Sequence, residues 1–491
     1  MYVSILLWTI TIFLIIFECM QRWNQKKYPP GPFSWPLIGN RSLLKGLVRK
    51  HGSQHVAFWK LAQKYKSDVI MLKLGMRNTI IVVSGVNAVH KLQRNHNFDG
   101  RPWNEFIKLR NMGIRKGITM NDGDEWKEIR SWVVRMLKTL GYGKQEMSKL
   151  IQNEIVTIIE SLKNGGIHRL KPIITPTVLN VLWTFTTGKR ISDFEKLQYF
   201  IKLMERRART FDLAGGTLST FPWIRYIAPE MSGYNLLVKV NNELKHILVN
   251  TINDHKENYV PGKENDLIDM FLREMYNEKE SNRIFTEDQL LLILVDLFIA
   301  GINTTATTLD FLLLHMVVYQ DVQKKVKEEI SSKIGLIEFP KLEDRSKLDY
   351  VEAVITEAQR ICGIIPISGP RRVFEETIFE GYTIPKNASI LINQYSVHMD
   401  PDVYPNPHEF KPERFLKDDT FKLDPNLTLF GKGNRRCPGE KLAKAAIFLL
   451  FVGIMQKYTL LPVQDKGPYV IEIIPGLTLS PKPYEVLVVP Q

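Results

Sequence analysis

The chain has 491 residues, of which 44% are hydrophobic and 24% charged, and its formal net charge is +14. This composition excludes a disordered or low-complexity chain, and the length allows a large core in roughly two to four domains. The positive charge indicates an anionic partner, which nucleic acid, an acidic protein or an anionic membrane would satisfy. Only three cysteines occur, without disulfide-like spacing, so a reducing compartment fits best.

The N-terminal stretch is apolar, because residues 1–17 carry no charged side chain. As a helix they span about 25 Å, slightly less than a hydrocarbon core of about 30 Å, and the next few residues can complete the span. Basic residues follow, which places the C-terminal side in the cytosol. A cleaved signal peptide would need a basic start and a small-residue cleavage site, and neither is visible. We therefore expect a transmembrane signal-anchor over residues 1–21.

Residues 22–40 form a basic and proline-rich linker, which contains the run Tyr28-Pro29-Pro30-Gly31-Pro32. Proline fixes φ and excludes helix, so this run predicts a stiff connection. No second linker of this kind and no internal repeat follows. Residues 41–491 are therefore expected to form one catalytic domain.

Alternating hydrophobicity over residues 68–83 predicts a β-hairpin with its turn near Gly75–Asn78. From there to Lys333 most segments have the pattern of helices, and strands with proline-broken loops return after Arg371. The predicted fold class is mainly α with minor β-sheet.

A long helix is predicted from Thr286 to Asp310. It opens with Thr286-x-x-Gln289, a capping-box pattern, and it is apolar nearly all round, so it belongs in the protein interior. Within it lies Ala300-Gly301-Ile302-Asn303-Thr304-Thr305. Glycine and β-branched residues are poor helix formers, and buried polar groups need partners. Such a local conflict indicates a functional position.

Two further pairs share a helix face. Trp126 and Arg130 are four residues apart, and Glu357 and Arg360 are three apart. Taken alone, the first pair indicates an amphipathic helix with a surface arginine, and the second indicates a surface ion pair.

The most informative stretch is Phe430-x-x-Gly433-x-x-x-Cys437-x-Gly439. Gly431 and Gly433 allow a tight turn, and Pro438 suits the first position of the helix that follows. The start of that helix points its free amides at the Cys437 sulfur, which favours a thiolate, and a thiolate binds metals. The alternative for an isolated cysteine at such a junction is a buried, inert thiol.

This loop resembles the haem-binding loop of the cytochrome P-450 superfamily, in which a cysteine thiolate is the axial ligand of haem iron. The proline-rich linker, the Ala300–Thr305 run, the Glu357–Arg360 pair and Pro370-Arg371 resemble further motifs of that family, in the same order. Among the members of this family, the chain most resembles the animal microsomal enzymes of the family 2 branch, and an invertebrate member in particular. It implies the cytochrome P-450 fold with an N-terminal transmembrane anchor.

The resemblance assigns roles to single residues. Cys437 would ligate the iron of haem b, and Glu357 and Arg360 would form a buried network with Arg414. Thr304, assisted by Asn303 or water, would support proton delivery, although Asn303 stands where the family usually has an acid. The residues expected to bind the cofactor are Arg101, Trp126, Arg130, Arg371, Arg435, Phe430 and Gly439. The segment Phe221–Pro229 would be a mobile lid near the membrane, and Ile474–Leu479 would reach into the substrate pocket.

The implied function is haem-thiolate monooxygenation of a lipophilic substrate, either terpenoid or steroid-like or a foreign compound. No flavin or nucleotide fingerprint is present, so electrons would come from NADPH-cytochrome P-450 reductase, with cytochrome b5 as a further partner that the resemblance allows. A basic cluster would dock the reductase, and no nucleic-acid-binding module is visible. The cluster consists of Lys432, Arg435, Arg436, Lys441, Lys444 and Lys127.

The expected location is the endoplasmic reticulum membrane, with a single span in the lipid bilayer and the catalytic domain on the cytosolic side. Two alternatives remain open. One is an oxygen-independent haem-thiolate enzyme that rearranges a lipid peroxide, which the missing acid at Asn303 favours slightly. The other is a haem-binding sensor or carrier without turnover.

Overall fold

The structure is a computed structural model that describes residues 2, 5, 8, 9, 11–13 and 16, and then residues 27–35, 38–75, 78–141, 145–209, 216–277, 284–464 and 467–491. The predicted anchor over residues 1–21 therefore lies largely outside the described residues. The chain forms two compact units. The first consists of Met1–Pro102 and Ile367–Ser396, and the second of Trp103–Pro366 and Val397–Gln491. The boundaries expected for linker and catalytic domain stay a prediction.

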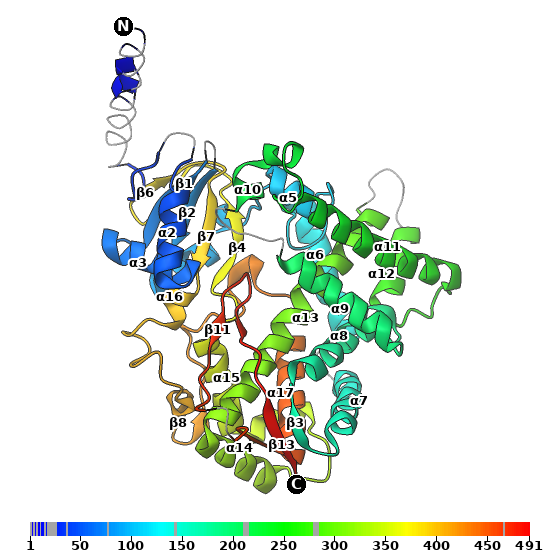
Figure 1. The fold of residues 1–491 in the computed structure, drawn as a ribbon. Coiled ribbons are helices and arrows are strands. Elements are labelled where there is room, and N and C mark those ends of the chain that lie inside the picture. The colour runs from blue at the N-terminus through cyan, green and yellow to red at the C-terminus, as the bar shows by residue number, and fades with distance from the viewer. Residues whose placement is uncertain are drawn as a thin grey trace. The chain divides into compact units, whose positions relative to one another are not determined.

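The first unit is built on a four-stranded mixed sheet (Figure 1). Its helical elements are α2 (Arg41–His51), α3 (Gln54–Tyr65), α4 (Val86–Arg94) and the short 3-10 helix η1 (His96–Phe98), and α16 (Tyr395–His398) begins at its end. Its strands are β1 (Val69–Leu74), β2 (Asn78–Val83), β4 (Ile367–Arg372), β5 (Thr377–Phe379), β6 (Tyr382–Ile384) and β7 (Ser389–Asn393).

The main sheet of this unit has the strand order β1-β2-β7-β4. β1 and β2 pair antiparallel, which confirms the predicted hairpin, and turn residues 76 and 77 lie outside the described residues. β2 pairs with β7 in parallel, and β4 pairs with β7 antiparallel across an irregularity between Ser368 and Arg371. The sheet thus joins two segments that are far apart in the sequence.

The second unit is mainly helical. Its helices are α5 (Glu105–Arg110), α6 (Gly123–Thr139), α7 (Gln145–Leu162), α8 (Lys171–Thr187), α9 (Phe194–Arg209), α10 (Thr217–Thr220), α11 (Tyr234–Asn258), α12 (Leu267–Asn277), α13 (Glu287–Val318), α14 (Gln320–Lys333), α15 (Asp349–Cys362) and α17 (Glu440–Lys457). Its 3-10 helices are η2 (Pro222–Tyr226), η4 (Leu342–Lys347), η5 (Pro412–Phe415) and η6 (Gly433–Arg435).

The strands of the second unit are short. They are β3 (Gly166–His168), β8 (Leu416–Lys417), β9 (Thr420–Phe421), β10 (Tyr458–Leu461), β11 (Ile473–Ile474), β12 (Ser480–Pro481) and β13 (Val486–Pro490). β10, β13 and β3 form a three-stranded sheet, and the other four strands form two small hairpins. A mainly α fold with minor β-sheet is confirmed.

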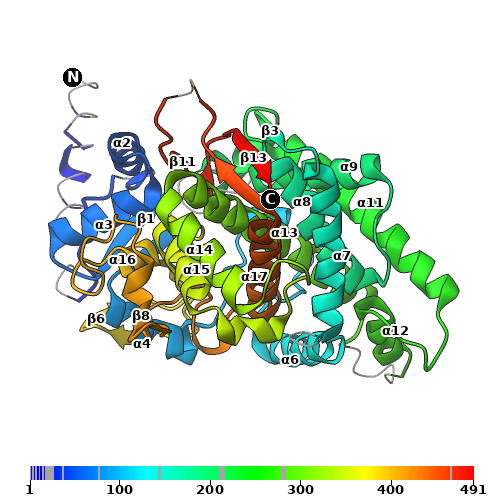
Figure 2. The ribbon, with the colours of Figure 1, turned by 90° about the horizontal axis from the view of Figure 1, so that it is seen from below.

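The core of the second unit is built around α13, which packs against α8, α15 and α17 (Figures 1 and 2). The helix is apolar on nearly every side, so it can be stable only where other helices cover it. The Thr286 hydroxyl accepts the Gln289 backbone amide at 3.3 Å, which confirms Thr286 as the cap residue. The Gln289 side chain faces Glu125 and Gly117, so the reciprocal bond of the predicted capping box is replaced by contacts to another segment. The helix continues to Val318, beyond the predicted end at Asp310. Its length and apolarity alone would also suit a membrane span, but most of it is buried in the protein.

Candidate functional site

The loop from Phe430 to Gly439 closes on itself at the candidate cysteine. The Cys437 amide donates to the Phe430 carbonyl at 2.9 Å, which draws the two ends of the loop together. Gly431 and Gly433 have φ values of 71° and 70°, in the left-handed region that other residues rarely adopt. The predicted tight turn is therefore present, and it sets the position of the sulfur.

The helix that follows the loop begins at Glu440, and Gly439 is its cap residue. Pro438 lies just before this cap, so its predicted place at the first helical position is wrong. We expected the amides of Gly439 and Glu440 to donate to the Cys437 sulfur, and the Gly439 amide does so. A Cβ added at Gly439 would lie 3.9 Å from that sulfur, an ordinary contact. What Gly439 contributes to the sulfur is therefore its amide.

The Cys437 side chain reaches solvent, although the protein surrounds it on most sides. This burial raises the pKa of the thiol, and the Glu440 carboxylate acts in the same direction. The Gly439 amide and the guanidinium groups of Arg130 and Arg436 lower it. The prediction that this environment favours the thiolate is wrong for the protein side chains by themselves, because desolvation outweighs the nearby dipole and cations.

The other described cysteine offers no such site. Cys362 is buried in α15, and its burial, together with the Glu357 carboxylate, raises the pKa of its thiol. Cys19 lies outside the described residues. Of the two cysteines that the structure describes, Cys437 is the one whose sulfur another group can reach.

Arg435, which is part of this loop, packs against Trp126 of α6. The Arg435 guanidinium carbon is 3.4 Å from the centroid of the Trp126 ring, and its Nη2 donates to the Asn121 carbonyl at 2.9 Å. The indole N–H of the buried Trp126 donates to the Ile118 carbonyl at 2.9 Å. Trp126 therefore contributes its ring face, which positions Arg435 by a cation–π contact, while its N–H is already bonded within the protein.

Arg130 ties α6 to the cysteine loop. It lies one helical turn after Trp126, and its Nη2 donates to the Arg436 carbonyl, next to Cys437. Its guanidinium carbon is 5.8 Å from the centroid of the Trp126 ring, so the predicted shared face is present. Phe430 faces a cation as well, since the Lys444 ammonium is 5.4 Å from its ring centroid. The structure thus gathers five of the seven predicted cofactor-binding residues around the loop that carries Cys437.

The remaining two arginines of the predicted cofactor site lie in the first unit, on or beside β4. Arg101 Nη1 donates to the Pro370 carbonyl at 2.6 Å, which holds its side chain along the strand. Arg371 is buried and forms an ion pair with Asp99 at 3.3 Å. Burial lowers the pKa of Arg371, and the Asp99 carboxylate opposes that effect. Both guanidinium groups are held in place by their neighbours within this unit.

α13 is accessible at one place in its middle. Every position from 289 to 317 is buried except 299, 300, 301, 303 and 304, and Ala300 is the most exposed of these. The Thr304 hydroxyl donates to the Ala300 carbonyl at 2.6 Å, so its lone pairs remain available as acceptors. No other residue in the described part of the chain forms a hydrogen bond with the side-chain amide of Asn303. The run Ala300–Thr304 is therefore the part of this core helix that a ligand can reach.

Packing between helices also explains why a glycine stands at position 301. A Cβ at this position would lie 2.7 Å from Leu182 Cδ2, so the missing side chain lets α8 approach α13 closely. The helix-breaking residue in the accessible run thus serves the contact between the two helices.

Glu357 and Arg360 form a buried network with Arg414, and the alternative of a surface ion pair is wrong. Arg360 Nε and Nη2 donate to the two Glu357 oxygens at 2.7 and 2.8 Å, and both side chains are fully buried. Arg414 Nε adds a bond to Glu357 at 2.9 Å. Arg360 also donates to the His398 and Pro407 carbonyls. The network joins α15 to η5 and to the chain before it.

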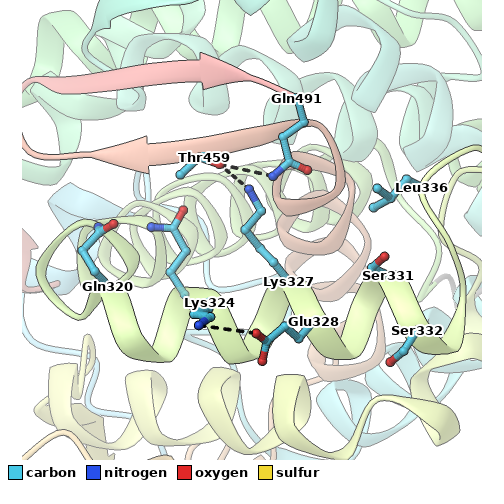
Figure 3. A pocket seen from close by; sticks show the side chains of 10 residues that line it. Gln320, Lys324, Lys327, Glu328, Ser331, Ser332, Leu336, Thr459 and Gln491 are labelled. Carbon is cyan, nitrogen blue, oxygen red and sulfur yellow. Dashed lines mark hydrogen bonds and ion pairs between the residues drawn. The ribbon is translucent and has the colours of Figure 1, made fainter.

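A surface groove of about 580 Å³ lies elsewhere, between α14 and the C-terminal end of the chain (Figure 3). Lys327 Nζ donates to Thr459 Oγ1, and Gln491 Nε2 donates to the same oxygen at 3.2 Å. None of the predicted site residues lines this groove. Its volume therefore says nothing about the chemistry at Cys437.

One group of buried charges was missed by the sequence reasoning. Arg110, Arg207 and Asp296 are all buried in the second unit. Asp296 alone carried a signal, because it is a lone acid within the apolar run Leu290–Phe298 of a core helix.

Comparison with known proteins decides the family. The sequence model described as "Cytochrome P450" matches residues 29–488. This chain belongs to the cytochrome P450 family. It is 38% identical over 475 residues to "Probable cytochrome P450 305a1" of Drosophila melanogaster, which covers 94% of each chain. It is 33% identical over 489 residues to "Farnesoate epoxidase" of Bombyx mori, with 98% of this chain and 97% of the relative covered.

The mouse "Cytochrome P450 2J5" is 30% identical over 502 residues, with 100% of this chain and 97% of the relative covered. The resemblance drawn from the sequence, including its similarity to family 2, is therefore confirmed. Cytochromes P450 are haem-thiolate oxidoreductases in which a cysteine is the axial ligand of the iron, and they act as monooxygenases with separate redox partners.

The residues present fit this cofactor. A reachable thiol stands just before the start of a helix, and the guanidinium groups of Arg130 and Arg435 lie at the same loop, where they suit the haem carboxylates.

Proposed function

We propose that this P450 inserts one atom of O2 into a lipophilic terpenoid, with electrons from an NADPH-dependent reductase. The observation that carries the proposal is the Cys437 sulfur, which is held by the Gly439 amide in a closed glycine loop and remains reachable. The relatives support the substrate class, because one of them is named for farnesoate, a terpenoid carboxylate. A steroid-like or foreign lipophile is the competing substrate class.

In this proposal Cys437 would ligate the haem iron, and the haem would supply the oxygen-activating chemistry. Iron bonding would offset the raised pKa of the thiol, because a coordinating metal deprotonates a thiol outright. Arg130 and Arg435 would bind haem carboxylates, and Trp126 would hold Arg435 in place. Arg101 and Arg371 are also proposed to bind haem carboxylates, while Phe430 and Gly439 shape the loop.

Proton delivery is proposed to depend on Thr304. Its hydroxyl proton points to the Ala300 carbonyl, so the oxygen can accept a hydrogen bond from a water molecule at the accessible face of α13. Asn303, which is half-exposed beside Thr304, can orient that water by hydrogen bonding. Unlike a carboxylate, its amide cannot take up or release a proton. The family's usual carboxylate would therefore be replaced here by a hydroxyl and ordered water.

The proposed location is the endoplasmic reticulum membrane, with residues 1–21 as a single span and the remaining chain in the cytosol. Apolar side chains of the lid segment Phe221–Pro229 support a second membrane contact, since Trp223, Tyr226 and Ile227 are 56%, 76% and 75% exposed. An acidic reductase is proposed to dock on the basic cluster around Cys437. Within that cluster Arg436 and Lys444 both pair with Glu440, which leaves less net charge than the sequence count suggests.

The test uses the full-length protein loaded with haem. The reduced carbon monoxide complex of the wild type should show a thiolate-type Soret band, and Cys437→His should abolish it. Cys362→Ala is the matched control and should keep the band, because that thiol is buried and inert. A band that survives Cys437→His would refute the ligand assignment.

Turnover then separates the candidate functions. A monooxygenase consumes NADPH and O2 through the reductase, whereas an enzyme that rearranges a lipid peroxide needs neither. Thr304→Ala should divert reducing equivalents to peroxide and lower the product formed per NADPH, and general acid–base assistance is worth roughly 10²–10⁴-fold. Asn303→Asp should be tolerated. Unchanged coupling in Thr304→Ala would favour the oxygen-independent reaction.

A further inference from the structure

The positive charge of the chain is concentrated in its first unit. Met1–Pro102 and Ile367–Ser396 together contain 18 of the 66 basic and only 6 of the 52 acidic side chains, a net charge of +12. The second unit is more than twice as long, but its 48 basic and 46 acidic side chains leave a net charge of only +2. The anionic partner that the charge of the whole chain indicates is therefore expected at the first unit.

One continuous stretch accounts for most of this imbalance. No aspartate or glutamate occurs between Glu18 and Asp68, whereas ten lysine and arginine residues do. The helices α2 and α3 lie within this stretch and pack against each other (Figure 1). A block with a single sign of charge repels itself, and it is typical of a surface that contacts an oppositely charged partner.

The cations of these two helices are exposed and are not neutralised locally. On α2, Lys45 and Arg49 are one turn apart and Lys50 lies beside them, on the side away from the buried Leu44. In the part of the chain that the structure describes, no carboxylate forms an ion pair with these three side chains or with the exposed lysines of α3 and its C-cap. Those lysines are Lys60, Lys64 and Lys66.

Apolar side chains are exposed in the same stretch. Phe33, Trp35, Ile38 and Leu43 are 39%, 56%, 41% and 42% exposed. Aromatic and aliphatic groups next to lysine and arginine are typical of segments at the lipid headgroup layer, where the apolar groups enter the interface and the cations meet phosphates. An acidic protein would pair with the cations alone. The mixture therefore favours a bilayer surface as the partner.

The chain itself keeps this unit close to a bilayer. The Thr383 amide donates to the Lys27 carbonyl at 2.8 Å, and the Met71 amide donates to the Pro30 carbonyl at 2.9 Å, so the chain is tied to the unit from Lys27 onward. Lys27 is six residues beyond the proposed end of the membrane span at residue 21. Six residues reach at most about 20 Å when fully extended, so the cations of this unit are held near lipid headgroups.

We propose that the exposed cations of α2 and α3 bind anionic lipid headgroups, which holds the first unit against a negatively charged membrane surface. Ammonium and guanidinium groups pair well with phosphate and carboxylate, and each lysine or arginine near such a surface strengthens binding on the order of fivefold. This inference rests on the proposed membrane location and adds the class of lipid that the protein recognises.

The test is lysine labelling of the full-length, haem-loaded protein in nanodiscs of two compositions. One contains phosphatidylcholine alone, and the other contains about 20% phosphatidylserine in addition. A membrane-impermeant acetylating reagent is applied, and the rate at each lysine is followed by mass spectrometry. The lysines of α2 and α3 should react about fivefold more slowly on the anionic discs. Salt at about 0.5 M should abolish the difference, because it screens charges beyond a few ångströms. Lys333 and Lys417 of the second unit are also exposed and should react equally on both discs.

A charge variant identifies the residues responsible. The triple variant Lys45→Gln, Arg49→Gln and Lys50→Gln should remove the protection of the α3 lysines on the anionic discs. The matched control removes three exposed lysines of the second unit instead and should keep that protection: Lys333→Gln, Lys417→Gln and Lys422→Gln. The comparison of the two lipid compositions needs no variant, so it stands even if the triple variant fails to fold.

The two proposals fail in different ways. Equal labelling of the α2 and α3 lysines on both discs would overturn the headgroup site and leave the proposed membrane location intact. Protection that appears only after purified reductase is added would assign this face to an acidic protein and would also overturn the site. A protein that stays on the anionic discs but not on the neutral ones would support the headgroup site and count against the anchor proposed for residues 1–21.

Discussion

The buried Glu357 network gives the sharpest stability prediction. The Glu357 carboxylate accepts Arg360 Nε and Nη2, Arg414 Nε and the Lys411 amide, at 2.7 to 3.0 Å, and its side chain is fully buried. Glu357→Gln keeps the shape but removes the charge and turns an amide NH2 toward guanidinium donors. Breaking one side of a buried ion pair costs about 3–5 kcal/mol, because the remaining charge stays buried without compensation.

A loss of this size is about a fifth or more of the 5–15 kcal/mol that stabilises a typical domain. The assay is urea unfolding of the full-length haem-loaded protein, followed by tryptophan fluorescence. Arg414→Gln should shift the midpoint less than Glu357→Gln, because the Arg414 side chain is 11% exposed and Arg360 remains paired.

Glu413→Gln is the matched control. It lies next to Arg414 in η5, but its ion pair with Lys325 is exposed, at 41% and 53%, and such pairs are worth about 1 kcal/mol or less. If Glu357→Gln shifted the midpoint no more than Glu413→Gln does, the argument from buried charge would be wrong.

Three further stability predictions follow from single buried positions. Gly453→Ala should cost about 1–3 kcal/mol, since its Cβ would lie 2.9 Å from Ile155 Cδ1 and Cγ2, and a smaller loss in an Ile155→Val background would identify that contact as the cause. Burial raises the pKa of Asp310 to about 6, so the free energy of unfolding should fall by roughly 3 kcal/mol as pH rises from about 4 to 6. Asp310→Asn should therefore have a higher urea midpoint than the wild type at pH 7, and the two midpoints should converge near pH 4. Burial lowers the pKa of His315 to about 4, so native stability should fall as pH drops below about 6.5, and His315→Gln should show a shallower fall over that range.

Local sequence signals predicted the features that depend on near neighbours. The glycines before Cys437 do take left-handed angles, the Thr286 cap is formed, and the 68–83 hairpin is present. The fold class followed from such signals as well. Each depends on residues within a few positions of one another, where propensity and spacing decide the structure.

Features that depend on distant partners could not be predicted in this way. Spacing alone made Glu357 and Arg360 a surface pair, because nothing nearby shows that η5 will cover them. The indole N–H of Trp126 donates to the Ile118 carbonyl. No pattern within the helix indicated this hydrogen bond. The raised pKa of Cys437 reflects desolvation by the folded protein, and that quantity is set by tertiary packing.

The pairing of β2 with β7 has a consequence for synthesis of the chain. Ile80 pairs with Ser389, so more than 300 residues must be added before the inner edge of the β1–β2 hairpin meets its partner. At 5–20 residues per second this takes roughly 15–60 s. During that time the apolar edge Ile80–Val83 is open to other chains, and unpaired edges of this kind promote aggregation. The nascent N-terminal hairpin should thus need a chaperone or the membrane surface until residues 389–392 have left the ribosome.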